Sequence, residues 1–257
     1  MPAFIYKLSG AGILFLFILI VELFSAVLPP FFPWDPTEES VRLGLALFSP
    51  IGASVGVLIG FLLNQAHANI NQIGVLVATE AGQINNLDRL LLRFGDHQSL
   101  HIRNNLKGYL ESIIRDEWPE LKLERGSNKT HMKWRAISQE LFKLDPKTPK
   151  QLAIYTEILE ASEHVAESRE SRIDRSSQKL PKVFWFATAI LLLAISSIGL
   201  LVGTDDHIAP FGMGIFPIVF GVMLGLLAIF DQPFKINNGI KPGALEKVYD
   251  SISTRNE

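Results

Sequence analysis

The chain contains no cysteine, which excludes a disulfide framework and a thiolate metal site. A net charge of only −2 over 257 residues gives no case for nucleic-acid binding. The sequence also lacks a glycine-rich phosphate loop, a nucleophile elbow and a recognisable pair of catalytic carboxylates. His97 and His101 have a spacing that zinc ligands use, but no third ligand accompanies them. We therefore expect no enzyme, no cofactor and no metal site.

Charged residues are also scarce in four apolar stretches near the two ends of the chain. These stretches are residues 10–28, 43–63, 183–204 and 208–230, and Glu22 in the first is their sole charge. The second has 21 uncharged residues, enough at 1.5 Å per residue to cross a hydrocarbon core of about 30 Å. A signal peptide is the competing interpretation of the first, but a glutamate is foreign to such a peptide and no A-x-A-like cleavage site follows. We expect four transmembrane helices.

The polar middle of the chain has helical periodicity and no strand pattern. Asp96 and Thr148 are placed to cap the starts of two helices, and Trp118-Pro119 is expected to end the first of them. Apolar residues recur at alternating spacings of three and four in two segments, which is the pattern of packed helices. The first seam is Ile70, Ile73, Val77, Glu80, Ile84, Leu87 and Leu91, and the second is Leu152, Tyr155, Leu159, Ser162, Ala166, Arg169 and Ile173.

Basic residues predict the orientation of the chain in the membrane. Lys7, the basic residues of the middle section and the tail lysines share one side, whereas both short loops on the other side are acidic. The positive-inside rule then places both termini and the middle section in the cytoplasm, for a multi-pass protein of the inner (plasma) membrane. The predicted class is an all-α integral membrane protein with two transmembrane helices before a cytoplasmic helical bundle and two after it. Its predicted parts are residues 1–64, 65–181, 182–231 and the tail 232–257.

Small and polar residues form a row on one face of the second apolar stretch. The row comprises Ser49, Gly52, Gly56, Gly60 and Asn64, and it is the candidate pore lining. Such a row lets another helix backbone come close, or leaves a lumen lined by backbone and small side chains. Both interpretations stay open at this point. The helical pattern then continues without a break into the polar section.

Three charged residues on the two seams are candidates for an ion pair. Glu80 lies about 24 Å along its helix from Asn64, and Arg169 lies about 20 Å before Lys182 on the returning helix. We therefore expect Glu80 to pair with Arg169, or with Arg172 one turn nearer the membrane, because a lone buried carboxylate is costly. The pair could fix helix register or act in gating. Glu22, as an intramembrane carboxylate, could contact ions or protons, or bond to a neighbouring helix.

The order of several short motifs gives a resemblance to a known family. These motifs are Glu80-Ala81, Leu87, Arg89 and Arg93, then Tyr109, Glu117-Trp118-Pro119, Arg169, Arg172, Leu180-Pro181 and Asp231-Gln232-Pro233-Phe234. In this order the chain resembles the bestrophin-like family of prokaryotic membrane proteins. The resemblance implies a homo-oligomer around a central axis, as in the pentameric bestrophin ion channels, with the second span lining the pore. Nothing here resembles the acidic calcium clasp of animal bestrophins.

The sequence therefore predicts a homo-oligomeric ion channel, whose partners are the lipid bilayer, further copies of itself and inorganic ions. Selectivity is open, with a lean to cations because the outer loops are acidic and the candidate pore face has no Lys or Arg. A membrane-anchored signalling or scaffold protein, whose bundle docks a partner, is the alternative. A transporter is a third option, because Glu22 lies in a span and the fourth span begins with glycines and prolines.

Overall fold

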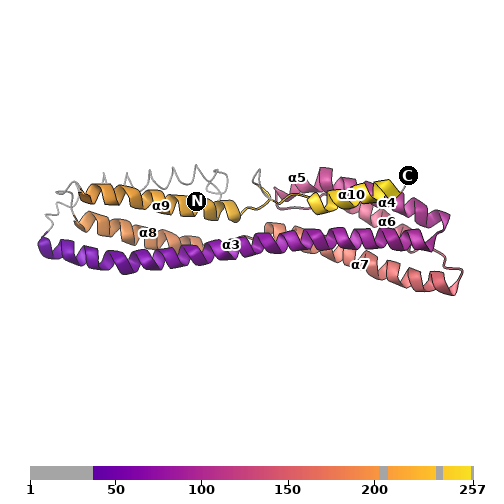
Figure 1. Cartoon of the computed structure of the whole chain (residues 1–257), viewed down its shortest axis with the longest axis horizontal. Helices are drawn as coiled ribbons and strands as arrows, with labels where there is room; N and C mark the ends of the chain where they lie inside the picture. Colours follow the sequence, from indigo (N-terminus) through magenta and orange to yellow (C-terminus); the bar gives the residue numbers. More distant parts are fainter. Residues whose placement is uncertain (1–36, 203–207, 236–239, 256–257) are drawn as a thin grey trace. The chain divides into compact units, whose positions relative to one another are not determined.

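The computed structural model describes residues 37–202, 208–235 and 240–255, and all regular structure in these ranges is helical (Figure 1). The elements are α3 (Glu38–Phe94), α4 (His97–Ser112), the π-helix η1 (Ile113–Glu117), α5 (Trp118–Leu121), α6 (Asn128–Leu141), α7 (Pro149–Ser177), α8 (Lys182–Val202), α9 (Ile208–Phe230) and α10 (Gly243–Arg255). The all-α prediction is confirmed for the described residues. The first predicted span and Glu22 lie outside them.

The chain divides into two compact units, each described here by itself. Unit 1 comprises residues 1–69 and 179–232, and unit 2 comprises residues 70–178 and 233–257. Helix α3 contributes its first part to unit 1 and its second part to unit 2. The predicted tail contains α10, which is part of unit 2.

Helix α3 is a single helix of 57 residues that continues through Pro50. Acidic residues occupy its first turn and Arg93 its last, so the charges at both ends favour the helix dipole. Gly95, with φ of +77°, follows the last turn, and its amide donates to the carbonyl of Leu91. A left-handed glycine at this position is a common way to end a helix. The predicted continuity of the second span with the polar section is confirmed.

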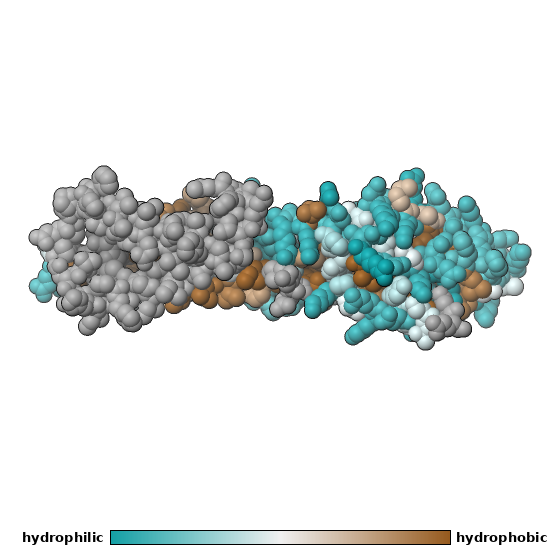
Figure 2. Space-filling model, turned by 90° about the horizontal axis from the view of Figure 1, so that it is seen from above, coloured by the Kyte–Doolittle hydropathy of each residue, from teal (hydrophilic) through white to brown (hydrophobic). Residues whose placement is uncertain are grey.

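Unit 1 has an apolar interior and an apolar exterior. One side of α3, including Val55 and Ile59, is buried against Leu192, Phe220 and Leu224 of α8 and α9. Other large apolar side chains point outward on the same three helices: Val57, Phe61, Val183, Phe186, Ile190, Val219, Val222 and Leu226. Where described residues of unit 1 are visible in Figure 2 they are mostly hydrophobic, whereas the visible face of unit 2 is mostly hydrophilic. An apolar exterior of this kind suits a lipid environment.

Two helical stretches of the described residues are long and apolar enough to cross a membrane. They are Val41–Phe94 and Pro149–Ile195, and Val219–Phe230 is a shorter apolar helix. The four-span arrangement stays a prediction. Within unit 1, the carboxylate of Asp231, directly after α9, accepts a hydrogen bond of 2.7 Å from the amide of Leu180, just before α8. This bond joins the two ends of the α8–α9 pair.

Unit 2 is a bundle with one continuous core, built from α3, α4, α6, α7 and α10. The predicted caps are confirmed, since Asp96 accepts from the amide of Ser99 and Thr148 from the amide of Gln151. Gln151 in turn accepts from the amide of Lys147, one residue before the cap. Ser127 caps α6 in the same manner. Helices α4, α6 and α7 thus begin where a local side chain satisfies one of their free amides.

The prediction that a helix ends at Trp118-Pro119 is wrong. After α4 the chain continues through η1 into α5, with the proline in the first turn of α5. Proline removes one backbone donor and clashes with the preceding turn, and the wider π-helical turn accommodates both effects. The π-helix ends at Glu117, and this residue is central to the site described next.

A buried charge cluster and the glycine face of α3

Two helices that are distant in sequence each place one charge at the centre of unit 2. Arg172 of α7 donates from Nε to Glu80 Oε2 at 2.5 Å and from Nη2 to Glu80 Oε1 at 3.1 Å. Both side chains are completely buried. Of the two partners expected for Glu80, the structure places Arg172 beside it. This fork-to-carboxylate geometry is the strongest form of side-chain ion pair.

Glu117, at the end of η1, extends this pair into a four-residue charge cluster. Its Oε1 accepts from Arg172 Nη2 at 2.7 Å and from Arg169 Nε at 3.2 Å, and Arg169 also donates to its Oε2. The charge cluster, Glu80, Glu117, Arg169 and Arg172, therefore holds two carboxylates and two guanidinium groups. Glu117 is part of the family motif Glu117-Trp118-Pro119, but its place in the charge cluster was not predicted from the sequence. Its position depends on the π-helical turn, which no spacing rule indicates.

A short loop closes over the charge cluster. The amide of Ser127 donates to Glu117 Oε2 at 3.2 Å, so the carboxylate also anchors the start of α6. A Cβ at Gly126 would lie 2.9 Å from Ile173 Cδ1 and 3.6 Å from both Arg169 Nη2 and Glu117 Oε2. Only a residue without a side chain lets the loop approach this closely without displacing a neighbour.

An aromatic pair supports the charge cluster from another side. The guanidinium carbon of Arg172 lies 5.5 Å from the centroid of the Trp118 ring, within the range of a cation–π contact. Trp118 in turn meets Phe234 edge to face at 5.6 Å and donates to the carbonyl of Ile240. The segment that precedes α10 is thus connected to the charge cluster through the indole ring.

Electrostatics favour the charged form of Arg172 although this side chain is buried. Burial alone would lower the pKa of Arg172, but the carboxylates of Glu80 and Glu117 outweigh it and raise that pKa above its ordinary value. Burial, and then the charge of Glu80, raise the pKa of Tyr109 well above its ordinary value. Paired and hydrogen-bonded charges of this kind avoid the cost of an isolated buried ion, and removing one member would leave another unpaired.

A second buried group of charges lies further along α3. Asp88, which is fully buried, accepts from Arg103 of α4 at 2.8 Å, and Arg255 of α10 lies 3.1 Å away. Arg255 also donates to Asn85 at 2.5 Å. Sequence analysis did not identify this group, because Arg103 and Arg255 have no periodic relation to Asp88. Helix α3 therefore forms a buried ion pair with α7 through Glu80 and another with α4 through Asp88. Asp88 also forms a partly exposed ion pair with α10.

The candidate pore residues on α3 are exposed or half-buried among the described residues. Ser49, Gly60 and Asn64 are exposed, and Gly52 and Gly56 are half-buried. A Cβ at Gly56 or Gly60 would meet no heavy atom of the described residues within 4 Å. Gly56 directly follows buried Val55, and Gly60 directly follows buried Ile59. The row of glycines and the row of buried apolar residues therefore lie about 100° apart around the helix.

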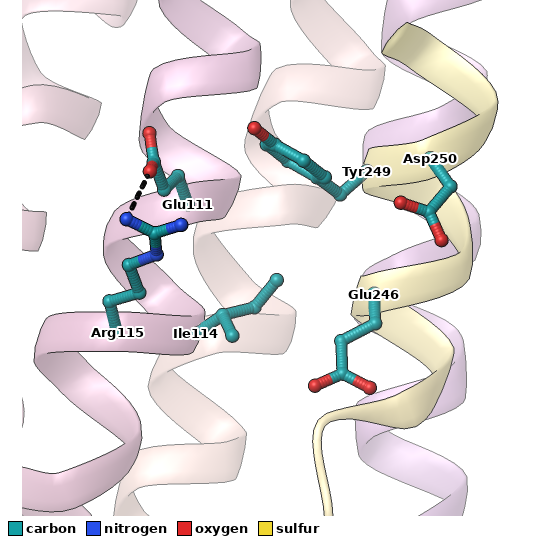
Figure 3. Close-up of a pocket in the computed structure, with 6 residues that line it drawn as sticks. All are labelled: Glu111, Ile114, Arg115, Glu246, Tyr249 and Asp250. Atoms are coloured by element: carbon teal, nitrogen blue, oxygen red, sulfur yellow. Dashed lines mark ion pairs between the residues drawn. The ribbon is translucent and has the colours of Figure 1, made fainter. Parts of the chain in front are cut away.

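A surface pocket of about 320 Å³ lies between α4 with η1 and α10 (Figure 3). Its lining is Glu111, Ile114, Arg115, Glu246, Tyr249 and Asp250, and it shares no residue with the charge cluster. Glu111 pairs with Arg115 at 2.9 Å, whereas α10 presents its two carboxylates and the tyrosine from the opposite side. The described residues contain no group of three His, Asp or Glu side chains that could hold a metal ion.

Of the two histidines with zinc-like spacing, His101 makes polar contacts to neighbouring side chains. His101 lies 3.7 Å from Glu140 of α6, and Asn105 donates to the same carboxylate at 2.9 Å. His97 is exposed in the first turn of α4. The contacts of His101 and Asn105 with Glu140 join α4 to the end of α6.

The described residues combine all-helical structure with long apolar helices, an apolar exterior on one unit and buried ion pairs in the other, which is typical of membrane proteins. A family profile for the bestrophin-like domain matches residues 15–245. The chain belongs to the bestrophin-like family. No curated protein matches it.

Solved structures show the same fold. A bacterial bestrophin homologue from Klebsiella pneumoniae has a TM-score of 0.68 at 14% identity, covering 95% of this chain and 97% of that one. A tryptophan-to-alanine variant of that homologue gives 0.70 at 15%, with coverages of 97% and 99%. An isoleucine-to-threonine variant gives 0.63 at 18%, with coverages of 96% and 98%. The similarity therefore extends over nearly the whole of each chain.

Proposed function

We propose that the chain forms a homo-oligomeric ion channel in which the first part of α3 lines the pore. The observation that carries this proposal is the open glycine face. The described helices of unit 1 do not pack on Gly56 and Gly60, so tight packing against these helices does not account for the two glycines. An exposed polar continuation follows at Asn64 and Gln65. A helix with one buried face and one face of small and polar residues suits a position between its own subunit and a water-filled axis.

For this channel we propose a topology with four transmembrane helices in the inner membrane. The helical bundle and both termini lie in the cytoplasm in this topology. Its support is the acidic character of the two short loops and the basic character of the middle section and tail. Family membership supports both the membrane location and an assembly of several copies around an axis, since bestrophins are known as ion channels. Five subunits, as in bestrophins, is the number we propose.

The charge cluster has a structural role in this proposal. Glu80 is on the same helix as the candidate pore face, and Arg172 and Glu117 hold that helix in one register against α7 and η1. A pair that is fully buried and multiply bonded is suited to fixing register rather than to contacting permeant ions. A change in the cluster would reach the pore through α3 itself, because α3 is continuous between the two.

We propose that the channel prefers cations. The candidate pore face from Ser49 to Asn64 has no Lys or Arg, so it offers an anion no fixed positive charge. The acidic outer loops would raise the local cation concentration at the mouth. The side-chain oxygens of Ser49 and Asn64, both exposed, are ligands that can replace part of a cation's hydration shell.

The test is ion flux into liposomes that hold the purified protein, with sodium, potassium and chloride gradients imposed in turn. The proposal predicts cation flux that Gly56→Leu blocks, because the larger side chain would fill the lumen. Val57→Leu is the matched control, since Val57 is exposed on a different face of the same turn. Chloride flux would overturn the selectivity alone. Absence of flux, or flux that Gly56→Leu leaves unchanged, would overturn the pore assignment.

A further inference from the structure

One end of unit 2 exposes three large apolar side chains that the ion-channel proposal does not use. Phe142 is 70% exposed, Leu152 57% and Leu100 44%. They come from the residue after α6, the first turn of α7 and the first turn of α4. Most side chains of this size in the bundle form a continuous core, and the other large apolar ones that are exposed in unit 2 are Val75, Leu92, Leu123 and Met132.

Hydrogen bonds bring the three segments to the same end of the bundle. Gln151, beside Leu152, donates to the carbonyl of Phe94 at the end of α3, and α4 begins three residues later. Asn105 of α4 donates to Glu140, two residues before Phe142. Figure 1 shows the α3–α4 turn and the α6–α7 connection at one end of unit 2. We name the three apolar residues and their charged neighbours the end surface.

The charged neighbours are mostly basic. Arg93, Lys143, Lys147 and Lys150 are all exposed, and no carboxylate of the described residues forms an ion pair with any of them. The one exposed acid among them is Asp145, while Asp96 uses its carboxylate to cap α4. The end surface therefore combines apolar anchors with a surplus of positive charge.

We propose that the end surface binds an acidic protein segment that carries bulky apolar side chains. Apolar anchors in a charged rim are typical of protein interfaces, and a negative partner would be steered to the four cations. A membrane surface is a poorer fit. Membrane-binding helices present one continuous apolar face along their length, whereas here single side chains come from three separate helix ends. This proposal does not depend on the channel function proposed above, and it gives the docking alternative a location.

The experiment is selection of a displayed library of random short peptides on the full-length protein in nanodiscs of zwitterionic lipid. Selected peptides are then synthesised, and their dissociation constants are measured by fluorescence anisotropy. We expect enrichment of Asp and Glu together with Leu, Phe or Trp. Phe142→Ser and Lys147→Glu should each weaken binding by about tenfold or more, the effect of losing an anchor or steering charge.

Leu123→Ser is the matched control, because Leu123 is 61% exposed but lies between α5 and α6, away from the end surface. It should leave the affinity unchanged, and none of the three variants should alter ion flux. No enrichment, peptides without acidic residues, or equal binding by Phe142→Ser would overturn the proposal. Recruitment of the nanodiscs to anionic vesicles, lost in Phe142→Ser, would assign the surface to membranes and overturn it too.

Discussion

The charge cluster makes a sharp prediction about Glu117. In Glu117→Gln the side chain keeps its shape but loses its charge, and one of its two oxygens becomes an amide donor. That oxygen accepts bonds from Arg169 and from the amide of Ser127, or, in the other orientation, from Arg169 and Arg172. Either way a donor would face a donor, and Arg169 would lose its only carboxylate partner among the described residues.

The expected loss follows from the burial of the groups involved. Removing one partner of a buried ion pair costs about 3–5 kcal/mol, because the other charge remains buried and uncompensated. Because Arg172 is fully buried and Arg169 nearly so, water can screen little of the uncompensated charge. Since each 1.4 kcal/mol is a factor of ten, the open population of the bundle should rise by roughly two to three and a half orders of magnitude.

Hydrogen exchange of the full-length protein in nanodiscs measures the open population of the bundle directly, through the opening free energies of amides in α4 and α7. Glu111→Gln is the matched control. Glu111 lies on α4 just before η1 and also pairs with an arginine, but its partner Arg115 is 74% exposed, so its loss should cost about 0–1 kcal/mol. Equal exchange in the two variants would refute the idea that Glu117 holds the bundle together.

Two further predictions concern the neighbours of the charge cluster. Because burial raises the pKa of Tyr109, this tyrosine keeps its phenolic proton above pH 10 in the folded state but loses it on unfolding. The free energy of unfolding should therefore fall with rising pH above pH 10, by up to about 1.4 kcal/mol per pH unit. Tyr109→Phe should remove that part of the slope in pH-dependent unfolding; an unchanged slope would contradict it. Gly126→Ala should destabilise unit 2 by about 1 kcal/mol, because the far end of the Ile173 side chain has to move, whereas Gly74→Ala, in open space, should not destabilise it. Equal melting temperatures of the two variants would contradict this.

The long-range architecture could be predicted because it follows from periodic patterns. The apolar stretch and the seam that follows it predicted the continuous helix α3, and local chemistry predicted the caps at Asp96 and Thr148. Simple helix rise brought Glu80 to the height of the arginines on α7. Each of these features depends on residues close in sequence or on one straight helix, and a sequence contains that information.

Other parts of the site could not be predicted, because they depend on irregular geometry. Glu117 reaches the cluster only through a π-helical turn, and the residue spacing in the sequence does not indicate such a turn. Arg255 reaches Asp88 only because α10 packs on the bundle, and a tail with few apolar residues gave no sign of that. The exposure of Phe142 likewise depends on tertiary packing, since a phenylalanine at a helix end is as often buried.

The most direct test of the pore uses the natural absence of cysteine, which makes single-cysteine variants free of background. A water-soluble, membrane-impermeant thiol reagent is applied to cysteines placed in turn at positions 52, 56 and 60, at buried Val55 and Ile59, and at outward Val57. If α3 lines the pore, the three glycine positions are modified and flux changes with modification, while the other three positions do not react. Modification at none of the glycine positions, or modification without any change in flux, would contradict the account.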